Sequence, residues 1–185
     1  RHQKVLEECP SPAIDAETRA KIGKVCADAV ASINYAGAGT IEFLYENGEF
    51  FFIEMNTRIQ VEHPITEMIT GIDLVQEMIR VCGGAPLSVK QDQITKTGHA
   101  IEVRINAEDP HMQFMPWPGT LDSLKIPEGD GIRFDHFLYE GYQIPPFYDS
   151  LLGKIIVHAP TRAEAITKIK TALLATELTG LKTTI

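Results

Sequence analysis

The sequence is short of cysteines, of basic residues and of long hydrophobic runs, and each shortage argues against a class of protein. Its three cysteines, Cys9, Cys26 and Cys82, are far apart, which is typical of reduced core residues. It has 17 Lys and Arg against 25 Asp and Glu, and a net charge of -8 disfavours nucleic acid as a partner. No secretory signal or apolar run of membrane length is present, so we expect no membrane association and a cytoplasmic location, or the mitochondrial matrix in a eukaryote.

What the sequence does contain is the composition of a globular chain with a buried core. Hydrophobic residues make up 44% and charged residues 23% of the 185 residues, which suits one domain or one and a half. The chain begins with Arg1 rather than Met and ends at Ile185 without a capping or tail pattern. We therefore expect it to be a piece of a longer protein.

Three helices are expected, because capping residues precede apolar residues at helical spacing. Asp15 precedes the first apolar stripe, and Asp73 precedes a second stripe that ends at Gly83. Thr161 and Glu164 have the spacing of a capping box before a third stripe. A shorter turn or helix is expected between Pro64 and Gly71.

The second half of the chain is rich in expected strands. Residues 98–107 alternate strictly, with Glu102, Arg104 and Asn106 on the polar side. Further strands are expected at 120–126, 132–138 and 151–158, the first two joined at 129–131. Residues 85–97 have no clear hydrophobic period. They therefore suggest a division of the chain into residues 1–84, a connecting region at 85–97, and an α+β part at 98–185.

A hairpin followed by a polar cluster is the most informative segment. Two strands, 39–45 and 50–56, flank Asn47-Gly48, the strongest short-range hairpin signal. A two-residue turn would place Glu42 opposite Ile53 and mix polar with apolar side chains on both faces. We therefore predict a three-residue loop, 47–49, which makes one face apolar by setting Ile41 opposite Met55, Phe43 opposite Ile53 and Tyr45 opposite Phe51.

In the predicted register, two carboxylates and an amide share the other face. Glu42 lies across from Glu54, with Asn56 two residues further along, and like charges directly opposite repel. Carboxylate and amide oxygens suit Mg²⁺, or Mn²⁺, bound with nucleotide phosphates. The alternative is a solvent-facing sheet edge that carries acids for solubility. We favour the metal site because Arg58, Gln60 and Glu62 follow directly.

Five unbroken segments carry a family resemblance across nearly the whole chain, namely Arg1–Lys4, Gly37–Leu44, Glu54–Pro64, Gly98–Pro110 and Pro145–Ser150. They resemble biotin carboxylases, and they are far more specific than a generic nucleotide-binding pattern. The resemblance implies an ATP-grasp fold, in which two α+β lobes hold ATP between them. This chain would supply the second lobe, an antiparallel sheet with helices, and part of the α+β C-terminal domain of biotin carboxylase.

The resemblance also implies a reaction. In biotin carboxylases, MgATP phosphorylates bicarbonate to carboxyphosphate, which breaks down to carbon dioxide and phosphate, and deprotonated biotin captures the carbon dioxide. Glu62 would be the base that deprotonates bicarbonate, and Arg104 would stabilise deprotonated biotin. The resemblance further implies that Glu42, Glu54 and Asn56 bind Mg²⁺ and that His2, Leu44, Glu42 and Glu54 bind ATP. The residues implied to bind bicarbonate are Lys4, Arg58, Gln60, Val61 and Glu62. The implied catalytic residues are Lys4, Arg58, Glu62 and Arg104.

Several of these residues have a purely structural alternative. Arg58 could form a surface ion pair with Glu62, and Arg104 could pair with Glu102 or Asp109. Lys4 and His2 could simply be solvated near the chain end. His63 is expected to fix its loop rather than bind a metal, because no second His or Cys lies at metal spacing. Tyr148 and Asp149 either face the site or form turn chemistry after Pro145-Pro146.

Two classes of function follow. The first is the magnesium and bicarbonate half of a biotin carboxylase, such as that of the acetyl-CoA carboxylase of fatty acid biosynthesis. We expect this half to be inactive in isolation. The expected partners of the whole enzyme are a biotin carboxyl carrier protein or domain, a carboxyltransferase and a second copy of the enzyme. The second is a non-catalytic folding or dimerisation module, with Arg133 in a loop at the contact. Another ATP-grasp ligase, such as a carbamoyl phosphate synthetase, is a weaker third alternative.

Overall fold

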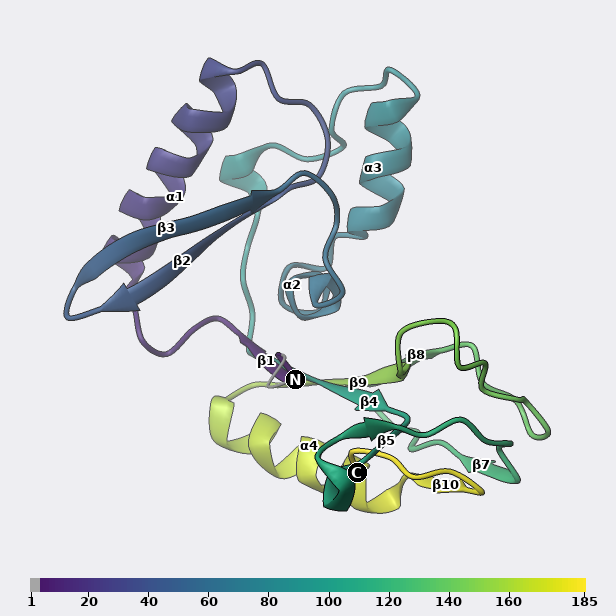
Figure 1. Cartoon of the computed structure of the whole chain (residues 1–185). Helices are drawn as coiled ribbons and strands as arrows, with labels where there is room; N and C mark the ends of the chain where they lie inside the picture. Colours follow the sequence, from purple (N-terminus) through teal and green to yellow (C-terminus); the bar gives the residue numbers. More distant parts are fainter. Residues whose placement is uncertain (1–3) are drawn as a thin grey trace.

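The computed structural model describes residues 4–185, which form a hairpin with helices and a four-stranded sheet with helices on both faces (Figure 1). The helices are α1 (Ala16–Ser32), α2 (His63–Thr70), α3 (Leu74–Cys82) and α4 (Arg162–Ala175), with 3-10 turns at Gln91–Gln93 and Pro110–Met112. The strands are β1 (Leu6–Cys9), β2 (Thr40–Glu46), β3 (Glu49–Asn56), β4 (His99–Asn106), β5 (Glu108–Asp109), β6 (Met115–Pro116), β7 (Ser123–Lys125), β8 (Ile132–His136), β9 (Leu151–Ala159) and β10 (Glu177–Thr179).

The predicted helix starts are confirmed. The carboxylate of Asp15 accepts from Thr18 N at 2.8 Å, and that of Asp73 accepts from Gln76 N at 2.8 Å. Thr161 begins α4 with a complete capping box, in which Glu164 accepts from the Thr161 backbone N–H. Each cap satisfies amide groups that would otherwise lack a partner at the helix start.

The main sheet is antiparallel, in the order β1-β4-β9-β8, and it lies between α4 on one face and α2 on the other (Figure 1). The α4 face carries the larger apolar core, which includes Ile101, Ile105 and Ile155. The α2 face carries a smaller apolar cluster around Ile65 and Ile156. The polar side of β4 is therefore covered by a helix rather than facing solvent.

The hairpin has the predicted pairing of its acids but not the predicted turn. Asn47 and Gly48 form a two-residue turn with φ of 52° and 87°, and Glu46 pairs with Glu49. Positive φ at both positions matches the twist of a hairpin, which explains why the shorter turn is preferred. A bulge in β3 then absorbs one residue, so that Glu42 still pairs with Glu54. Phe43 pairs with Phe52 and Tyr45 with Phe50, so those two predicted partners are wrong.

Other differences from prediction arise from pairings distant in sequence. The strands expected at 120–126 and 132–138 are shorter and belong to separate sheets, since β7 pairs with β10 and β8 with β9. Arg133 lies within β8 rather than in a loop. Cys82 is exposed, so the expectation of a core cysteine is wrong there.

Strand β1 was not expected, and it adds an N-terminal segment to the sheet of the second half by pairing with β4. The division into residues 1–84, 85–97 and 98–185 stays a prediction. Within residues 4–185, none of the helices combines the length and the apolar character needed to cross a bilayer.

Candidate functional site

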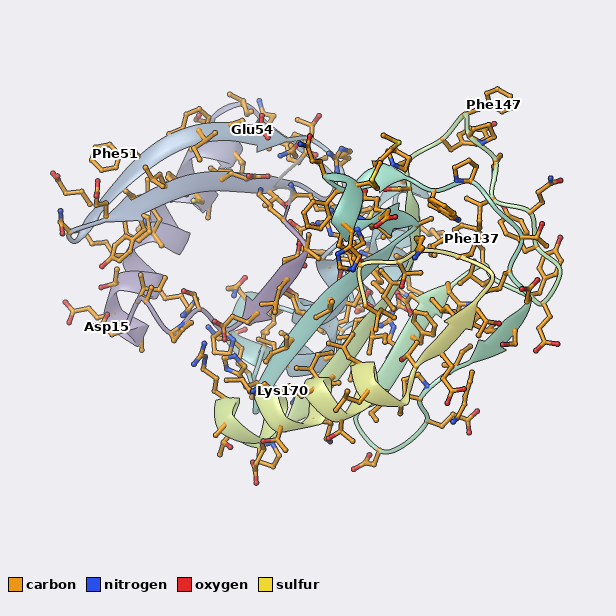
Figure 2. All side chains as sticks on the ribbon, turned by 60° about the horizontal axis from the view of Figure 1, so that its bottom comes forward. Asp15, Phe51, Glu54, Phe137, Phe147 and Lys170 are labelled. Carbon is orange, nitrogen blue, oxygen red and sulfur yellow. The ribbon has the colours of Figure 1, made fainter. Side chains whose placement is uncertain are left out.

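A cleft of about 370 Å³ lies between strand β4 and the end of the hairpin from which the loop at 57–62 leaves. Figure 2 shows Glu54 toward this end of the hairpin and Phe51 toward its far tip. The lining residues come from the N-terminal segment, both hairpin strands, the loop at 57–62 and β4, and they are Lys4, Glu42, Glu54, Asn56, Arg58, Gln60, Val61, Glu62 and Arg104. Of the site residues predicted from the sequence that the structure describes, Leu44 is the one that does not line the cleft.

Glu42 is the centre of the polar contacts at the hairpin end of the cleft. Its carboxylate accepts from Asn56 Nδ2 at 3.0 Å and from Gln60 Nε2 at 2.6 Å, and it forms an ion pair with Lys4. The hydrogen bond from Lys4, followed by that from Gln60, holds the pKa of Glu42 below its usual value. Glu42 is therefore ionised at neutral pH and ready to bind a cation.

The residues predicted to bind a metal fit a hard divalent cation. Glu54 Oε1 accepts from Asn56 Nδ2 at 3.1 Å, so one amide nitrogen lies between the carboxylates of Glu42 and Glu54. Turning the Asn56 amide about its last torsion would present the oxygen instead, giving two carboxylates and one carbonyl oxygen beside an open cleft. Among residues 4–185, no three His, Cys, Asp or Glu side chains form a metal-binding group by themselves. Any cation here would complete its coordination with water or phosphate oxygens, as Mg²⁺ usually does.

The loop at 57–62 holds its charged side chains apart from one another. Arg58 donates to Ile59 O at 3.1 Å and to Asn56 Oδ1 at 3.4 Å, and in the described part of the chain no ion pair joins it to Glu62. The suggested Arg58–Glu62 pair is therefore wrong. Glu62 instead accepts from Arg104 at 2.9 Å. The guanidinium of Arg58 remains available to an anion in the cleft.

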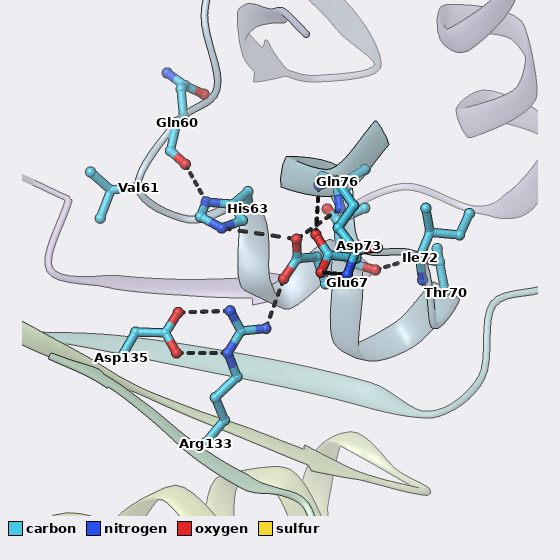
Figure 3. A network of polar contacts seen from close by, with 12 residues as sticks. Gln60, Val61, His63, Glu67, Thr70, Ile72, Asp73, Gln76, Arg133 and Asp135 are labelled. Atoms are coloured by element: carbon cyan, nitrogen blue, oxygen red, sulfur yellow. Dashed lines mark hydrogen bonds and ion pairs between the residues drawn. The ribbon is translucent and has the colours of Figure 1, made fainter. Parts of the chain in front are cut away.

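Helix α2 begins directly after this loop and is fixed to the sheet by a polar network (Figure 3). His63 Nδ1 lies 2.8 Å from Gln60 O, which confirms the prediction that His63 fixes its loop. Glu67 contacts Arg133 at 2.7 Å, and Arg133 forms two hydrogen bonds to Asp135 at 2.7 and 2.8 Å. A network of this kind positions the start of α2, and with it the end of the site loop.

Arg104 reaches the cleft from β4. Its NH2 atom lies 2.9 Å from both Glu7 Oε1 and Glu62 Oε2, so the expected alternatives, Glu102 and Asp109, are not its partners. The contact with Glu7 is an ion pair without the angle of a hydrogen bond, because among the described residues both Glu7 oxygens lack a hydrogen-bond partner. Burial raises the pKa of Glu7 despite the nearby Arg104 charge.

Three charged residues lie beneath the cleft; sequence reasoning missed Glu7 and Lys154, and it considered Glu102 only as a possible partner of Arg104. Glu102 is 0% exposed and Lys154 is 8% exposed, on strands β4 and β9. Lys154 had a detectable signal, since it is the one charged side chain in the apolar run Leu151–Val157. Glu7 had none, because its strand was not expected.

Glu102 is expected to make the stability of the fold depend on pH. Burial, the largest cause, raises its pKa from 4.5 to about 8, against the opposing charge of Lys154. The raised pKa means that its stabilising contribution is full below pH 4.5 and is lost as the pH rises through 8. We predict that in Glu102→Gln the free energy of unfolding falls less between pH 5 and pH 8 than in the wild type. Denaturant unfolding across this range measures it, with exposed Glu128→Gln as the control; identical slopes for wild type and Glu102→Gln would contradict the prediction.

Three predicted or suggested residues, Leu44, Tyr148 and Asp149, do not line the cleft. His2 lies outside the described residues. Leu44 is 56% exposed on β2, and its role in adenine packing stays a prediction. Tyr148 is 80% exposed, and Asp149 accepts from Leu151 N at 3.0 Å, which is turn chemistry.

Two family models match the chain in succession. Residues 1–90 match the ATP-binding domain of the carbamoyl-phosphate synthase L chain, and residues 102–185 match the biotin carboxylase C-terminal domain. The biotin carboxylase of Haemophilus influenzae is 56% identical over 185 residues, which is all of this chain and 41% of that protein. The biotin carboxylase of Pseudomonas aeruginosa is 52% identical over 183 residues, which is 99% of this chain and 40% of that protein.

The structural comparison agrees. The biotin carboxylase domain dimer of Hydrogenobacter thermophilus 2-oxoglutarate carboxylase, in complex with MgADP, ADP and bicarbonate, has a TM-score of 0.97 and 46% identity, covering 99% of this chain and 41% of that one. The hairpin, its acidic cleft and the sheet that follows therefore define an ATP-grasp protein. The matches over the full chain are more specific, and the chain belongs to the biotin carboxylase family. It spans about two fifths of the length of these relatives.

Proposed function

We propose that this chain is the second ATP-grasp lobe and part of the C-terminal domain of an enzyme that carboxylates biotin on a carrier protein, using MgATP and bicarbonate. One observation carries the proposal. A single cleft gathers two acids and an amide at one end, a guanidinium and an amide beside them, and a carboxylate paired with a second guanidinium at the other end. This order follows the order of the reaction, from phosphate to bicarbonate to biotin.

The bicarbonate end of the cleft combines an anion site with a base. Arg58, Gln60, the Val61 N–H and Lys4 would bind bicarbonate, because a planar anion suits a forked guanidinium. Glu62 would take the proton from the bound bicarbonate, whose oxygen would then attack the terminal phosphorus of ATP in line, with ADP as the leaving group. Glu42, Glu54 and Asn56 would bind Mg²⁺, which supplies neutralisation of the phosphate charge.

The biotin end is adjacent to this base. Arg104 would bind the ureido oxygen of biotin, where negative charge develops when the ring nitrogen loses its proton. Arg104 lies 2.9 Å from Glu62, so carbon dioxide would be released beside the biotin that captures it. Short transfer distances limit escape of the gas into water. A biotinylated carrier, a carboxyltransferase and a second copy of the enzyme are the partners of this proposal.

Glu54→Gln tests the magnesium end of the proposal in the complete enzyme. Among the described residues, the side chain of Glu54 forms a hydrogen bond with Asn56 alone, so the substitution leaves the contacts of Glu42 with Lys4, Gln60 and Asn56 intact. We expect the Mg²⁺ concentration for half-maximal ATP cleavage to rise about tenfold or more, since one unit charge near a surface contributes more than the ~1.4 kcal/mol that a factor of ten needs.

The measurement is ATP cleavage that depends on bicarbonate and biotin, titrated with Mg²⁺. Glu46→Gln, an exposed acid near the turn of the same hairpin, is the matched control and should not alter the titration. An unchanged Mg²⁺ requirement in Glu54→Gln would rule out the metal site. If ATP cleavage by the wild-type enzyme depended on neither bicarbonate nor biotin, the proposed biotin carboxylase function would be ruled out.

A further inference from the structure

Lys154 is a buried lysine that contacts the site loop from below without lining the cleft. It lies on β9 and is 8% exposed, and its Nζ donates to the backbone carbonyl of Val61. Burying an ammonium group is costly unless the group is paired and hydrogen-bonded. An apolar side chain could fill this position at lower cost, so a purely packing role does not explain the lysine.

Charged residues on the neighbouring strands surround Lys154. Lys154 pairs across the strands with Arg104 on one side and with Asp135 on the other. Two cations opposite each other repel. Glu102, two residues before Arg104 on β4, is 0% exposed and has no hydrogen-bond partner among the described residues; with a pKa of about 8 it is mostly protonated at neutral pH and offsets only part of this repulsion. Burial lowers the pKa of Lys154, and the charges of Glu102 and Asp135 oppose that shift.

Lys154 contacts the loop at a peptide unit that lies between two predicted site groups. The Val61 carbonyl belongs to the peptide unit that joins Val61 to Glu62, so fixing its plane orients the residues on both sides. The Val61 N–H lies on one side of this unit, and the Glu62 carboxylate, contacted by Arg104 at 2.9 Å, lies on the other. Two neighbouring cations of the sheet therefore fix two successive groups of the loop, one through its backbone and one through its side chain.

We propose that Lys154 is a positioning residue that sets the bicarbonate-binding backbone of Val61 and the orientation of the Glu62 base. This inference rests on the function proposed above. Lys154 touches no substrate; it acts through the Val61–Glu62 peptide. Its loss therefore affects the bicarbonate step and leaves the nucleotide step unchanged.

The test is Lys154→Met in the complete enzyme, because Met keeps the length and bulk of the stem and removes the donor. The KM for bicarbonate should rise about tenfold or more, the loss expected when a charged donor leaves a carbonyl unpaired, while the KM for ATP stays within about twofold. Since Lys154→Met removes the cation beside the buried carboxyl group of Glu102, Lys154→Met with Glu102→Gln is the second variant. It should recover thermal stability and keep the raised KM for bicarbonate.

Lys168→Met is the matched control. Lys168 donates to two backbone carbonyls, Asp130 O at 3.0 Å and His158 O at 2.9 Å, but it lies on α4, on the other side of the sheet. Its loss should lower the melting temperature and leave both KM values unchanged. An unchanged KM for bicarbonate in the folded double variant overturns the role of Lys154 alone. Absence of bicarbonate-dependent ATP cleavage in the wild type overturns the proposed function, and the inference with it.

Discussion

Glu62→Gln is expected to lower biotin-dependent turnover of the complete enzyme by about 10²-fold to 10⁴-fold, the usual contribution of a general base. The amide has the shape of the carboxylate and can still accept from Arg104, which lies 2.9 Å away, but it cannot take a proton from bicarbonate. The loss should therefore appear in kcat, with the KM for ATP little changed, because the nucleotide contacts lie at the other end of the cleft.

Glu8→Gln is the control for this substitution. Glu8 is also a carboxylate held by an arginine, Arg162, at 2.7 Å, but it lies outside the cleft and should retain wild-type turnover. Steady-state kinetics and a thermal melt of each variant separate a catalytic loss from a loss of structure. Turnover near the wild-type value in folded Glu62→Gln would reject the role of Glu62 as the base.

The part of the cleft that could be predicted from the sequence is the part that is local in the chain. Six of the site residues lie within residues 54–62, and a single hairpin brings Glu42 to Glu54. Alternation and the Asn-Gly signal are therefore enough to predict their meeting. Arg104 is 42 residues from Glu62, and its place at the site was predicted from the family motif alone.

The turn shows how a correct pairing can follow from a wrong loop. The observed two-residue turn would have set Glu42 opposite Ile53, had the bulge in β3 not restored the register. The sequence favours apolar side chains on one face, and this constraint fixes the pairing of the acids more strongly than it fixes the position of the extra residue. Which residue bulges depends on packing that the alternation does not contain.

The residues beneath the cleft could not be predicted, because their partners are far apart in sequence. Lys154 contacts Val61 across 93 residues, and Glu7 meets Arg104 only because β1 joins the sheet beside β4. Strand β1 has four residues and no alternating pattern from which it could be predicted. Pairings of this range depend on the topology of the whole sheet rather than on local pattern.

Arg104→Ala is expected to lower kcat/KM for biotin by about 10²-fold to 10³-fold, the effect of removing one donor from a site where negative charge develops. Bicarbonate-dependent ATP cleavage without biotin should fall less, because Arg104 contacts the base but not the phosphates. This split between the two activities separates Arg104 from Glu62, whose loss affects both. The substitution also removes the cation beside Glu7, whose loss costs about 3–5 kcal/mol when the remaining charge stays buried.

Arg104→Ala combined with Glu7→Gln removes that uncompensated charge and is the variant whose kinetics decide the question. Arg162→Ala is the matched control, since Arg162 pairs with Glu8, the next residue of β1, and lies outside the cleft. Its loss should leave both activities unchanged. If the folded double variant carboxylated biotin at the wild-type rate, Arg104 would be a structural partner of Glu7 and Glu62, and the biotin end of the cleft would have to be sought among other residues.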